Sequence, residues 1–246
     1  MHRTELEWCR KRNLLERVIL TTGVMIFFVT GYFGVGRSTN LPRAHVLTTI
    51  LDERIPFVAD SVWIYLWVFP CALIPLFVVR CTRLFRRTAI AYAVVIAASL
   101  ICFIIFPVTS TGLRMAQAKL DVSVFSQWAI SRLYSIDPPY NLFPCLHLSV
   151  AGVAAFSVWK ASKPYGSAVF LSVIFVGMSV CTVKQHYLLD VLGGIALAAF
   201  ANALILRRYT PLDDATLAYS WRGPAAFLIF ALVVYAILYV AFLCFQ

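Results

Sequence analysis

Long apolar stretches constrain the fold of this chain more than any other feature. A helix of about 20 apolar residues crosses a bilayer, and the sequence holds seven stretches near this length. Hydrophobic residues make up 61% of the 246 residues and charged residues 13%, against ~45–50% and ~25% in soluble domains. This composition excludes a disordered chain, a coiled coil, a collagen and almost every soluble enzyme. We predict an all-α fold, a polytopic membrane helix bundle with spans at Val18–Val35, Ser61–Val79, Thr88–Phe106, Leu146–Trp159, Gly166–Val183, Tyr187–Leu206 and Pro224–Phe245.

The fourth stretch is shorter than the others. It reaches spanning length if its helix begins near Phe143, with Pro144 in the first turn, where proline is tolerated. Residues 1–208 then form a six-helix membrane core, and residues 209–246 add a linker and a further transmembrane helix. We expect no cleaved signal peptide, because the charged leader Met1–Arg17 is long and no A-x-A-like site follows the first span.

The chain carries a net charge of +10. No basic face with interleaved aromatic residues lies outside the turns that flank the membrane, so we expect no nucleic-acid partner. Fourteen of the 21 Lys and Arg residues precede the first span or lie in the loops on its side, and seven lie in the other loops. By the positive-inside rule, the N-terminus is cytoplasmic, and the loop over residues 109–142 and the C-terminus are outside.

The outer loop over residues 109–142 contains apolar residues at helical spacing. They predict either an amphipathic helix on the outer membrane interface or a short helix packed over the bundle. The residues are Val122, Phe125, Trp128, Ala129 and Leu133.

Ionisable residues at the ends of spans gather in three stretches, and the charge-based topology puts all three on the outer side. Such residues are functional hypotheses by default. One stretch ends at Arg114 and a second ends at His147, whereas the third contains Lys184, His186 and Asp190. His186 and Asp190 are four residues apart, so they share one helical face. Two histidines, an aspartate and two cations can thus converge in one outer site.

These residue types suit phosphoryl transfer through a phosphohistidine, with no metal and no cofactor. An adjacent carboxylate fixes the tautomer of a histidine, a second histidine protonates the leaving oxygen, and cations neutralise the phosphate. Other readings stay open: His147 as a headgroup or backbone hydrogen-bonder, and the His186–Asp190 pair as a structural contact. A zinc site formed by the two histidines and Asp190 is a further alternative, although the spacing shows no fourth ligand.

The remaining reactive residues indicate no second site. The seven cysteines show no CxxC and no metal-ligand spacing, so we expect no disulfide framework. We expect Cys145 to be a packing residue, because no arginine follows it as the cysteine-phosphatase mechanism requires. Asp60 is expected to make a helix-end or headgroup contact, and Gly193 and Gly194 to allow close helix packing. No role is assigned to the loop histidines, His2 and His45.

The sequence Phe-Pro-Cys-Leu-His at residues 143–147 resembles the second motif of the type-2 phosphatidic acid phosphatase superfamily, P-S-G-H or F-P-S-L-H. The sequence Lys-Gln-His-Tyr-Leu-Leu-Asp at residues 184–190 resembles its third motif, H-x-x-x-D. This wording, with residues 51–57 and 62–65, is closest to the branch that contains inositol phosphorylceramide synthases. The resemblance covers roughly residues 50 to 205. It implies a six-helix membrane core with its site at the outer face.

The resemblance also implies a role for each candidate residue. His186 would attack phosphorus, and Asp190 would orient it. His147 would protonate the leaving alcohol and then activate the acceptor. Arg114 would stand for the cation of the first motif, and Lys184 would be a further phosphate contact.

The phosphate-binding set departs from the family pattern. In the first motif, K-x6-R-P, Pro107 stands at the Lys position if Arg114 is the Arg, and Met115 follows it. Val180 stands where the third motif usually has Arg, and Cys145 replaces the Ser of the second motif. The His/His/Asp core is kept, so the departures concern the substrate and the rate.

Three functions are compatible with these observations. The first is an integral-membrane lipid-phosphate phosphatase. The second is a phosphotransferase of the inositol phosphorylceramide synthase type, which moves a phospho-headgroup to an alcohol. The third is a non-catalytic lipid-phosphate binder or transporter, suggested by the missing cations. The expected partners are membrane lipids and a lipid-phosphate substrate, and the expected location is a bacterial cytoplasmic membrane. The lipid and the oligomeric state stay open.

Overall fold

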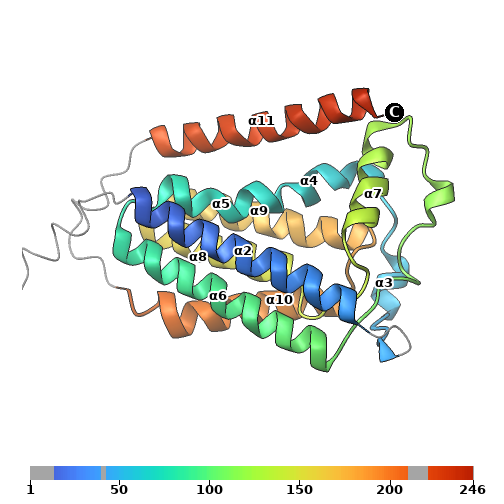
Figure 1. Ribbon diagram of the computed structural model, residues 1–246, viewed down its shortest axis with the longest axis horizontal. Coiled ribbons are helices and arrows are strands. Elements are labelled where there is room, and N and C mark those ends of the chain that lie inside the picture. The colour runs from blue at the N-terminus through green and yellow to red at the C-terminus, as the bar shows by residue number, and fades with distance from the viewer. Residues whose placement is uncertain (1–13, 40–42, 210–220, 246) are drawn as a thin grey trace, which may run out of the picture.

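The described residues form a bundle of long helices that run side by side (Figure 1). The computed structural model describes residues 14–39, 43–209 and 221–245. Six helical segments in these ranges are long and apolar enough to cross a membrane, and α8 is a shorter apolar helix among them. The long elements are α2 (Leu14–Ser38), α5 (Val68–Val78) preceded by η2 (Ala59–Ser61) and α4 (Val62–Leu66), α6 (Thr82–Ile105), α8 (Leu146–Ala161), α9 (Lys163–Thr182), α10 (Leu188–Ala201) continued by the π-helical η4 (Asn202–Leu206), and α11 (Arg222–Cys244).

All seven predicted stretches are helical, which confirms the membrane helix bundle. The boundaries differ by a few residues, most of all in α6, which begins at Thr82 rather than Thr88. The predicted extension of the fourth span to Phe143 is wrong, because α8 begins at Leu146. Cys145, the residue before α8, has an extended backbone with φ −61° and ψ 104°, so Pro144 lies before the helix and not in its first turn. The predicted linker over residues 209–220 lies largely outside the described residues.

The central helix of the bundle is α8, which packs against α5, α6, α9 and α10. It has 16 residues, or about 24 Å at 1.5 Å per residue, which is less than the ~30 Å hydrocarbon core. Small residues such as Ala151, Gly152 and Ala155 are buried along it. They let the surrounding helices approach closely, so α8 is surrounded by protein over most of its length.

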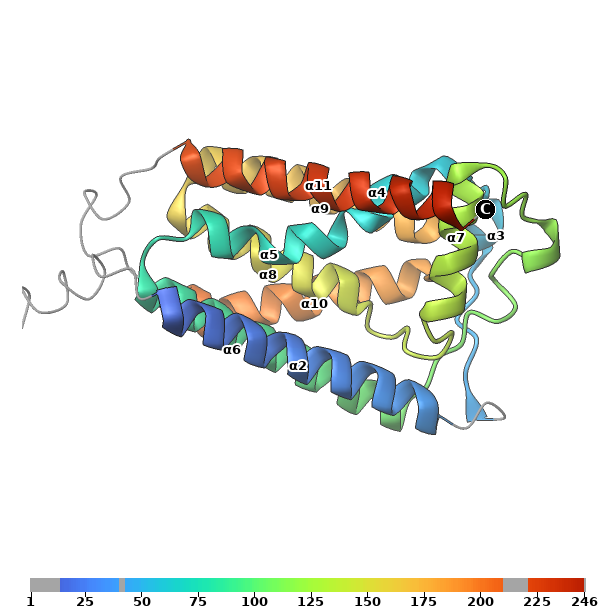
Figure 2. The same ribbon diagram turned by 45° about the horizontal axis from the view of Figure 1, so that its top comes forward.

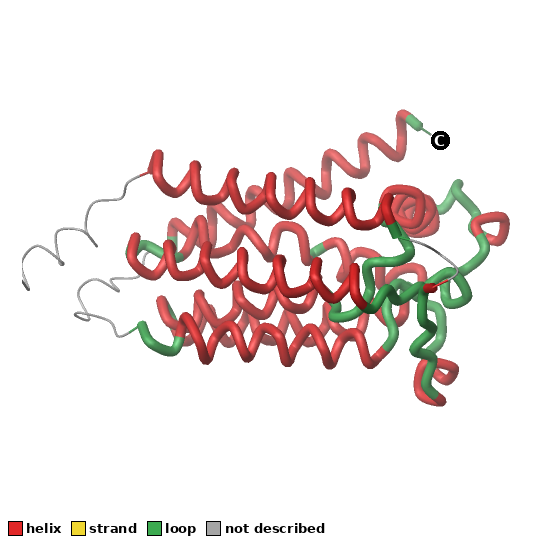
Figure 3. Tube along the Cα trace, turned by 60° about the horizontal axis from the view of Figure 1, so that its bottom comes forward, coloured by secondary structure: helices red, strands yellow, loops and turns green. Residues whose placement is uncertain are grey.

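Loops and short helices gather at one end of the bundle (Figure 3). This end, hereafter the site end, carries α3 (Ile50–Arg54), α7 (Phe125–Ile136) and the first turns of α8 and α10 (Figures 1 and 2). Isolated backbone bridges join His45 to Val108 and Val108 to Asn141, so three loops distant in sequence lie together there. The three polar stretches singled out in the sequence therefore share one end of the fold.

The predicted amphipathic helix is α7, which lies across the site end (Figure 2). Its apolar face covers the bundle: Trp128 and Leu133 are buried, and the tilted rings of Phe125 and Trp63 have centroids 4.2 Å apart. The packing of a short helix over the bundle is thus what the structure shows. Its position at a membrane interface stays a prediction.

The last helix, α11, runs along the outside of α5 and reaches α7 (Figure 1). The Tyr235 hydroxyl donates to the Trp63 carbonyl at 2.6 Å. Near the C-terminus the Phe242 ring lies 4.8 Å from that of Phe125. This helix therefore forms part of the wall of the bundle.

Candidate active site

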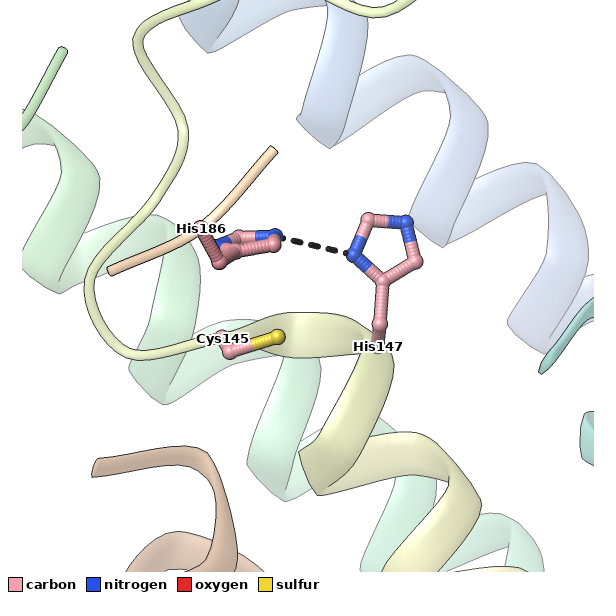
Figure 4. Close-up of side chains that lie close together, drawn as sticks. All are labelled: Cys145, His147 and His186. Atoms are coloured by element: carbon pink, nitrogen blue, oxygen red, sulfur yellow. Dashed lines mark hydrogen bonds between the residues drawn. The ribbon is translucent and has the colours of Figure 1, made fainter. Parts of the chain in front are cut away.

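Two histidines from different segments of the chain meet at the site end (Figure 4). His147 is the second residue of α8, and His186 lies in the turn between α9 and α10. The His147 Nδ1 and His186 Nε2 atoms are 3.1 Å apart, which is a hydrogen bond whose donor depends on the tautomers. The candidate acid and the candidate nucleophile are thus in direct contact.

Asp190 stands behind His186, as the i, i+4 spacing predicts. Its Oδ2 atom lies 3.4 Å from His186 Nδ1 and accepts a hydrogen bond of 2.9 Å from the Tyr187 amide. The second bond is the N-terminal cap of α10. Asp190 is fully buried and His186 is 3% exposed. The helix cap therefore fixes the carboxylate that faces the imidazole.

The pKa of His186 is raised to about 10. Burial lowers the pKa of this imidazole, but the sulfur of Cys145 and the carboxylate of Asp190 outweigh burial by stabilising the imidazolium. A raised pKa favours the imidazolium form of His186, in which Nε2–H can donate to Nδ1 of His147. The two rings together hold one transferable proton.

Cys145 lies beside the two histidines (Figure 4). It is fully buried at the N-cap of α8. Its Sγ atom and one ring nitrogen of each histidine all lie within 4.8 Å of one another. The sulfur thus belongs to the site and does more than fill apolar space, a proximity that the sequence spacing alone did not reveal.

Further polar side chains lie around the two histidines, and most of them belong to no motif in the sequence. The Tyr65 hydroxyl lies 3.0 Å from His147 Nε2. Asp137, just after α7, accepts hydrogen bonds from the Tyr32 hydroxyl and from Gln185 Nε2. Burial raises the pKa of Asp137, against the bond from Tyr32. Tyr32, Tyr65 and Asp137 come from α2, α4 and the end of α7, so no local spacing points to them, whereas Gln185 directly precedes His186.

The two predicted phosphate-binding cations are engaged by protein atoms in this structure. Arg114 Nη1 donates to the carbonyls of Tyr134 and Asp137 at 3.1 and 3.0 Å. Lys184 has a positive φ of 57°, and its ammonium donates to the carbonyls of Asp52 and Ile55 at 3.2 and 2.6 Å. Both side chains tie loops together at the site end, and their contact with a phosphate stays a prediction.

Gly194 allows α10 to approach the start of α8. A Cβ atom at this position would lie 2.4 Å from the Cys145 carbonyl oxygen. At Gly193 a Cβ would lie 2.7 Å from the Phe143 ring. The predicted close packing at these glycines is confirmed, and it holds His186 and Asp190 against the segment that carries His147.

An apolar cavity of about 240 Å³ leads away from His147 into the bundle. His147 and Tyr32 line its site end, and Leu20 and Phe85 line its far end. Between Leu20 and Tyr32 the axis of α2 rises by about 18 Å, which exceeds half of the ~30 Å hydrocarbon core. Met25 and Phe69 line it too, with relative exposures of 42% and 46%. The cavity therefore reaches the outer surface of the bundle.

The other polar candidates do not join the site. The His45 ring stacks on Phe106 with 4.3 Å between centroids. Asp60 lies within the short helix η2. His2 falls outside the described residues.

Comparison with known proteins gives one match. A family model described as the PAP2 superfamily matches residues 11–204. No curated protein matches the chain, and no solved structure matches it. The matched range contains every site residue described above and ends before α11. The match is to the superfamily, so the inositol phosphorylceramide synthase-like branch stays a prediction.

Proposed function

The chain belongs to the PAP2 superfamily, and from this premise we propose that it is a membrane-bound lipid-phosphate phosphatase that works through a phosphohistidine on His186. One observation carries the proposal: the buried cluster in which His147 contacts His186 and Asp190 stands behind His186. A base, an acid and an orienting carboxylate are what an activated histidine nucleophile needs.

The first chemical step uses the proton shared by the two rings. This proton moves from His186 Nε2 to His147 Nδ1, which frees the Nε2 lone pair. Nε2 attacks phosphorus, the bond between phosphorus and the lipid oxygen breaks, and His147 gives its proton to the leaving alkoxide. The products are a lipid alcohol and a phosphohistidine. Asp190 is a positioning residue that stabilises the imidazole through Nδ1.

The second step reverses the roles. Neutral His147 takes a proton from water, the water oxygen attacks phosphorus, and the bond between phosphorus and Nε2 breaks. Inorganic phosphate leaves, and the proton on His147 returns to the pair. The two steps together convert one phosphate monoester and one water into one alcohol and one phosphate.

The apolar cavity supports a lipid as the substrate. His147 lies at its site end, so a hydrocarbon chain in the cavity would place its phosphate beside the histidine pair. Two hydroxyl groups in the cavity wall bond to backbone carbonyls and not to the cavity space. The Tyr92 hydroxyl donates to the Ala72 carbonyl, and the Thr88 hydroxyl donates to the Leu84 carbonyl. Phe230 and Val234 of α11 complete the wall. We infer that this helix, outside the matched range, shapes the site for the chain.

Phosphate release from purified protein in nanodiscs tests the proposal. Labelled lipid phosphates are offered with and without diacylglycerol and inositol as acceptors, beside His186→Ala. We expect inorganic phosphate from the wild type and none from the variant. Equal release from both would refute the phosphatase. Label found in a new ester, with no free phosphate, would replace it with the transferase, which shares the first step.

A further inference from the structure

The Cys145 thiol adds a third metal-binding side chain to the two histidines of this site. We propose that Cys145, His147 and His186 form a binding site for a soft divalent cation such as Zn²⁺, and that its occupation stops turnover. The inhibition rests on the proposed function, whereas the binding does not.

The three donor atoms are already close to the positions that such an ion requires. Zinc binds nitrogen at ~2.0–2.1 Å and sulfur at ~2.3 Å in tetrahedral sites, so its ligand atoms lie about 3.3–3.7 Å apart. The two ring nitrogens are 3.1 Å apart, and all three donors lie within 4.8 Å of one another. A rotation of the rings away from their mutual hydrogen bond would aim both lone pairs at a common point beside the sulfur (Figure 4).

Both histidines have the outer partners that metal-bound histidines use. A metal-ligating histidine almost always donates its other ring nitrogen to a carboxylate, carbonyl or water. The second nitrogen of His186 faces Asp190 at 3.4 Å, and that of His147 faces the Tyr65 hydroxyl at 3.0 Å. The coordinating nitrogens are therefore the two that face each other.

The backbone holds these donors in place before any ion arrives. The Cys145 amide donates to the Asp190 carbonyl at 2.9 Å, and the His186 amide donates to the Val180 carbonyl at 3.1 Å. The start of α8 is thereby fixed to the start of α10. Little ordering is left to oppose binding.

The donor set selects the class of ion. A thiolate and two imidazoles favour Zn²⁺ and other soft or borderline ions over Mg²⁺ and Ca²⁺, which prefer oxygen. Binding converts the Cys145 thiol to a thiolate and displaces the proton shared by the rings, so two protons are released. The ion then occupies the Nε2 lone pair of His186, which is the proposed nucleophile. Serine at position 145, as in the family motif, would leave only two nitrogen ligands.

Zinc titration of turnover tests the proposal, with Cys145→Ser as the diagnostic variant. Neither protein is given metal before the titration. We expect Zn²⁺ to inhibit the wild type and Cys145→Ser to raise the half-inhibiting concentration at least about tenfold, the scale of losing a metal-site interaction. The inhibition of each protein is measured relative to its own turnover without metal. Cys244→Ser, which removes an exposed thiol, should leave the inhibition unchanged.

Cobalt absorption measures binding without turnover. Co²⁺ added to the wild type should give a thiolate-to-metal charge-transfer band that Cys145→Ser lacks and Cys244→Ser keeps. Absence of the band, or equal zinc inhibition of all three proteins, would overturn the proposed site. Turnover that is lost with a chelator and restored by Zn²⁺ would uphold the metal site and overturn both the inhibition and the His186 mechanism. If the metal-free wild type releases no phosphate but shows the cobalt band, the proposed phosphatase function is overturned and the proposed metal site is not.

Discussion

Replacement of Val234 by tryptophan should make the enzyme discriminate against long-chain substrates. Val234 lies on α11 and lines the apolar cavity. An indole there would fill space that the hydrocarbon chain needs over the ~18 Å length of the cavity. A chain that moves from lipid into the cavity gains no hydrophobic free energy, because lipid is equally apolar. The effect is therefore set by steric fit alone.

The expected magnitude follows from the cost of overpacking. Extra atoms in a filled apolar site cost typically 1–3 kcal/mol, which corresponds to about a 5- to 150-fold loss of kcat/KM at 1.4 kcal/mol per tenfold. A short-chain lipid phosphate that ends before α11 should change by less than about twofold, the scale of a neutral surface substitution. The quantity measured is the ratio of kcat/KM for long and short substrates in competition in nanodiscs.

The neighbouring Val233 provides a matched control. It has a relative exposure of 51% and does not line the cavity. Val233→Trp adds the same side chain to the same helix, and it should leave the ratio unchanged. The cavity would be refuted as the chain site if both variants changed the ratio alike, or if Val234→Trp lowered turnover of both substrates equally.

Three further predictions concern the site itself. Gly194→Ala places a Cβ 2.4 Å from the Cys145 carbonyl, so we expect turnover to fall by about 100-fold, the scale of a 1 Å misplacement; Gly177→Ala, whose nearest neighbour is at 3.5 Å, should be near neutral by the same assay. The raised pKa of His186 contributes stability that is complete below about pH 6.5 and lost as the pH rises towards 10; thermal unfolding from pH 6 to 10 should show this loss in the wild type, and the same slope in His186→Asn would contradict it. Asp137→Asn keeps the shape of the side chain but places an amide N–H against one of the two donors, Tyr32 or Gln185. We therefore expect the free energy of unfolding to fall by about 1–3 kcal/mol, measured as a lower Tm; an unchanged Tm would argue against the buried carboxylate network.

The sequence predicts the bundle well because apolar length is a local property. Each span can be recognised from the apolar residues of its own stretch of about 20 residues, as in α6 and α11. Boundaries are predicted less well, as in α8, which begins at Leu146 and not near Phe143. The charge pattern also placed the polar stretches together, and the structure brings them to one end of the fold.

The site was predictable only where its residues are neighbours in sequence or match a motif. His186 and Asp190 are one helical turn apart, and His147 has a motif around it. Asp137 and Tyr65 have neither signal, because Tyr65 contacts His147 from another segment and Asp137 accepts from Gln185, the neighbour of His186. The same holds for the proximity of the Cys145 sulfur to both rings, which depends on the packing of α8 against α10.

The altered cation set raises the question of how this site would neutralise a phosphate. Arg114 and Lys184 donate to backbone carbonyls in this structure, and their contact with a phosphate stays a prediction. The N-terminus of α10 is also occupied, because Asp190 and Asp52 accept from its first amides. The start of α8 differs: it has no side-chain cap, and a helix N-terminus carries about half a positive charge and free amides.

His147 lies in this first turn of α8. The positive end of the helix and the proton shared by His147 and His186 are therefore close to each other. An anion there would be held by a fixed dipole and by an imidazolium instead of by a set of arginines. Because the imidazolium loses its proton as the pH rises towards about 10, we expect phosphate affinity to fall over the same range. A family member with the full cation set would keep its affinity over the same range, since arginine stays charged.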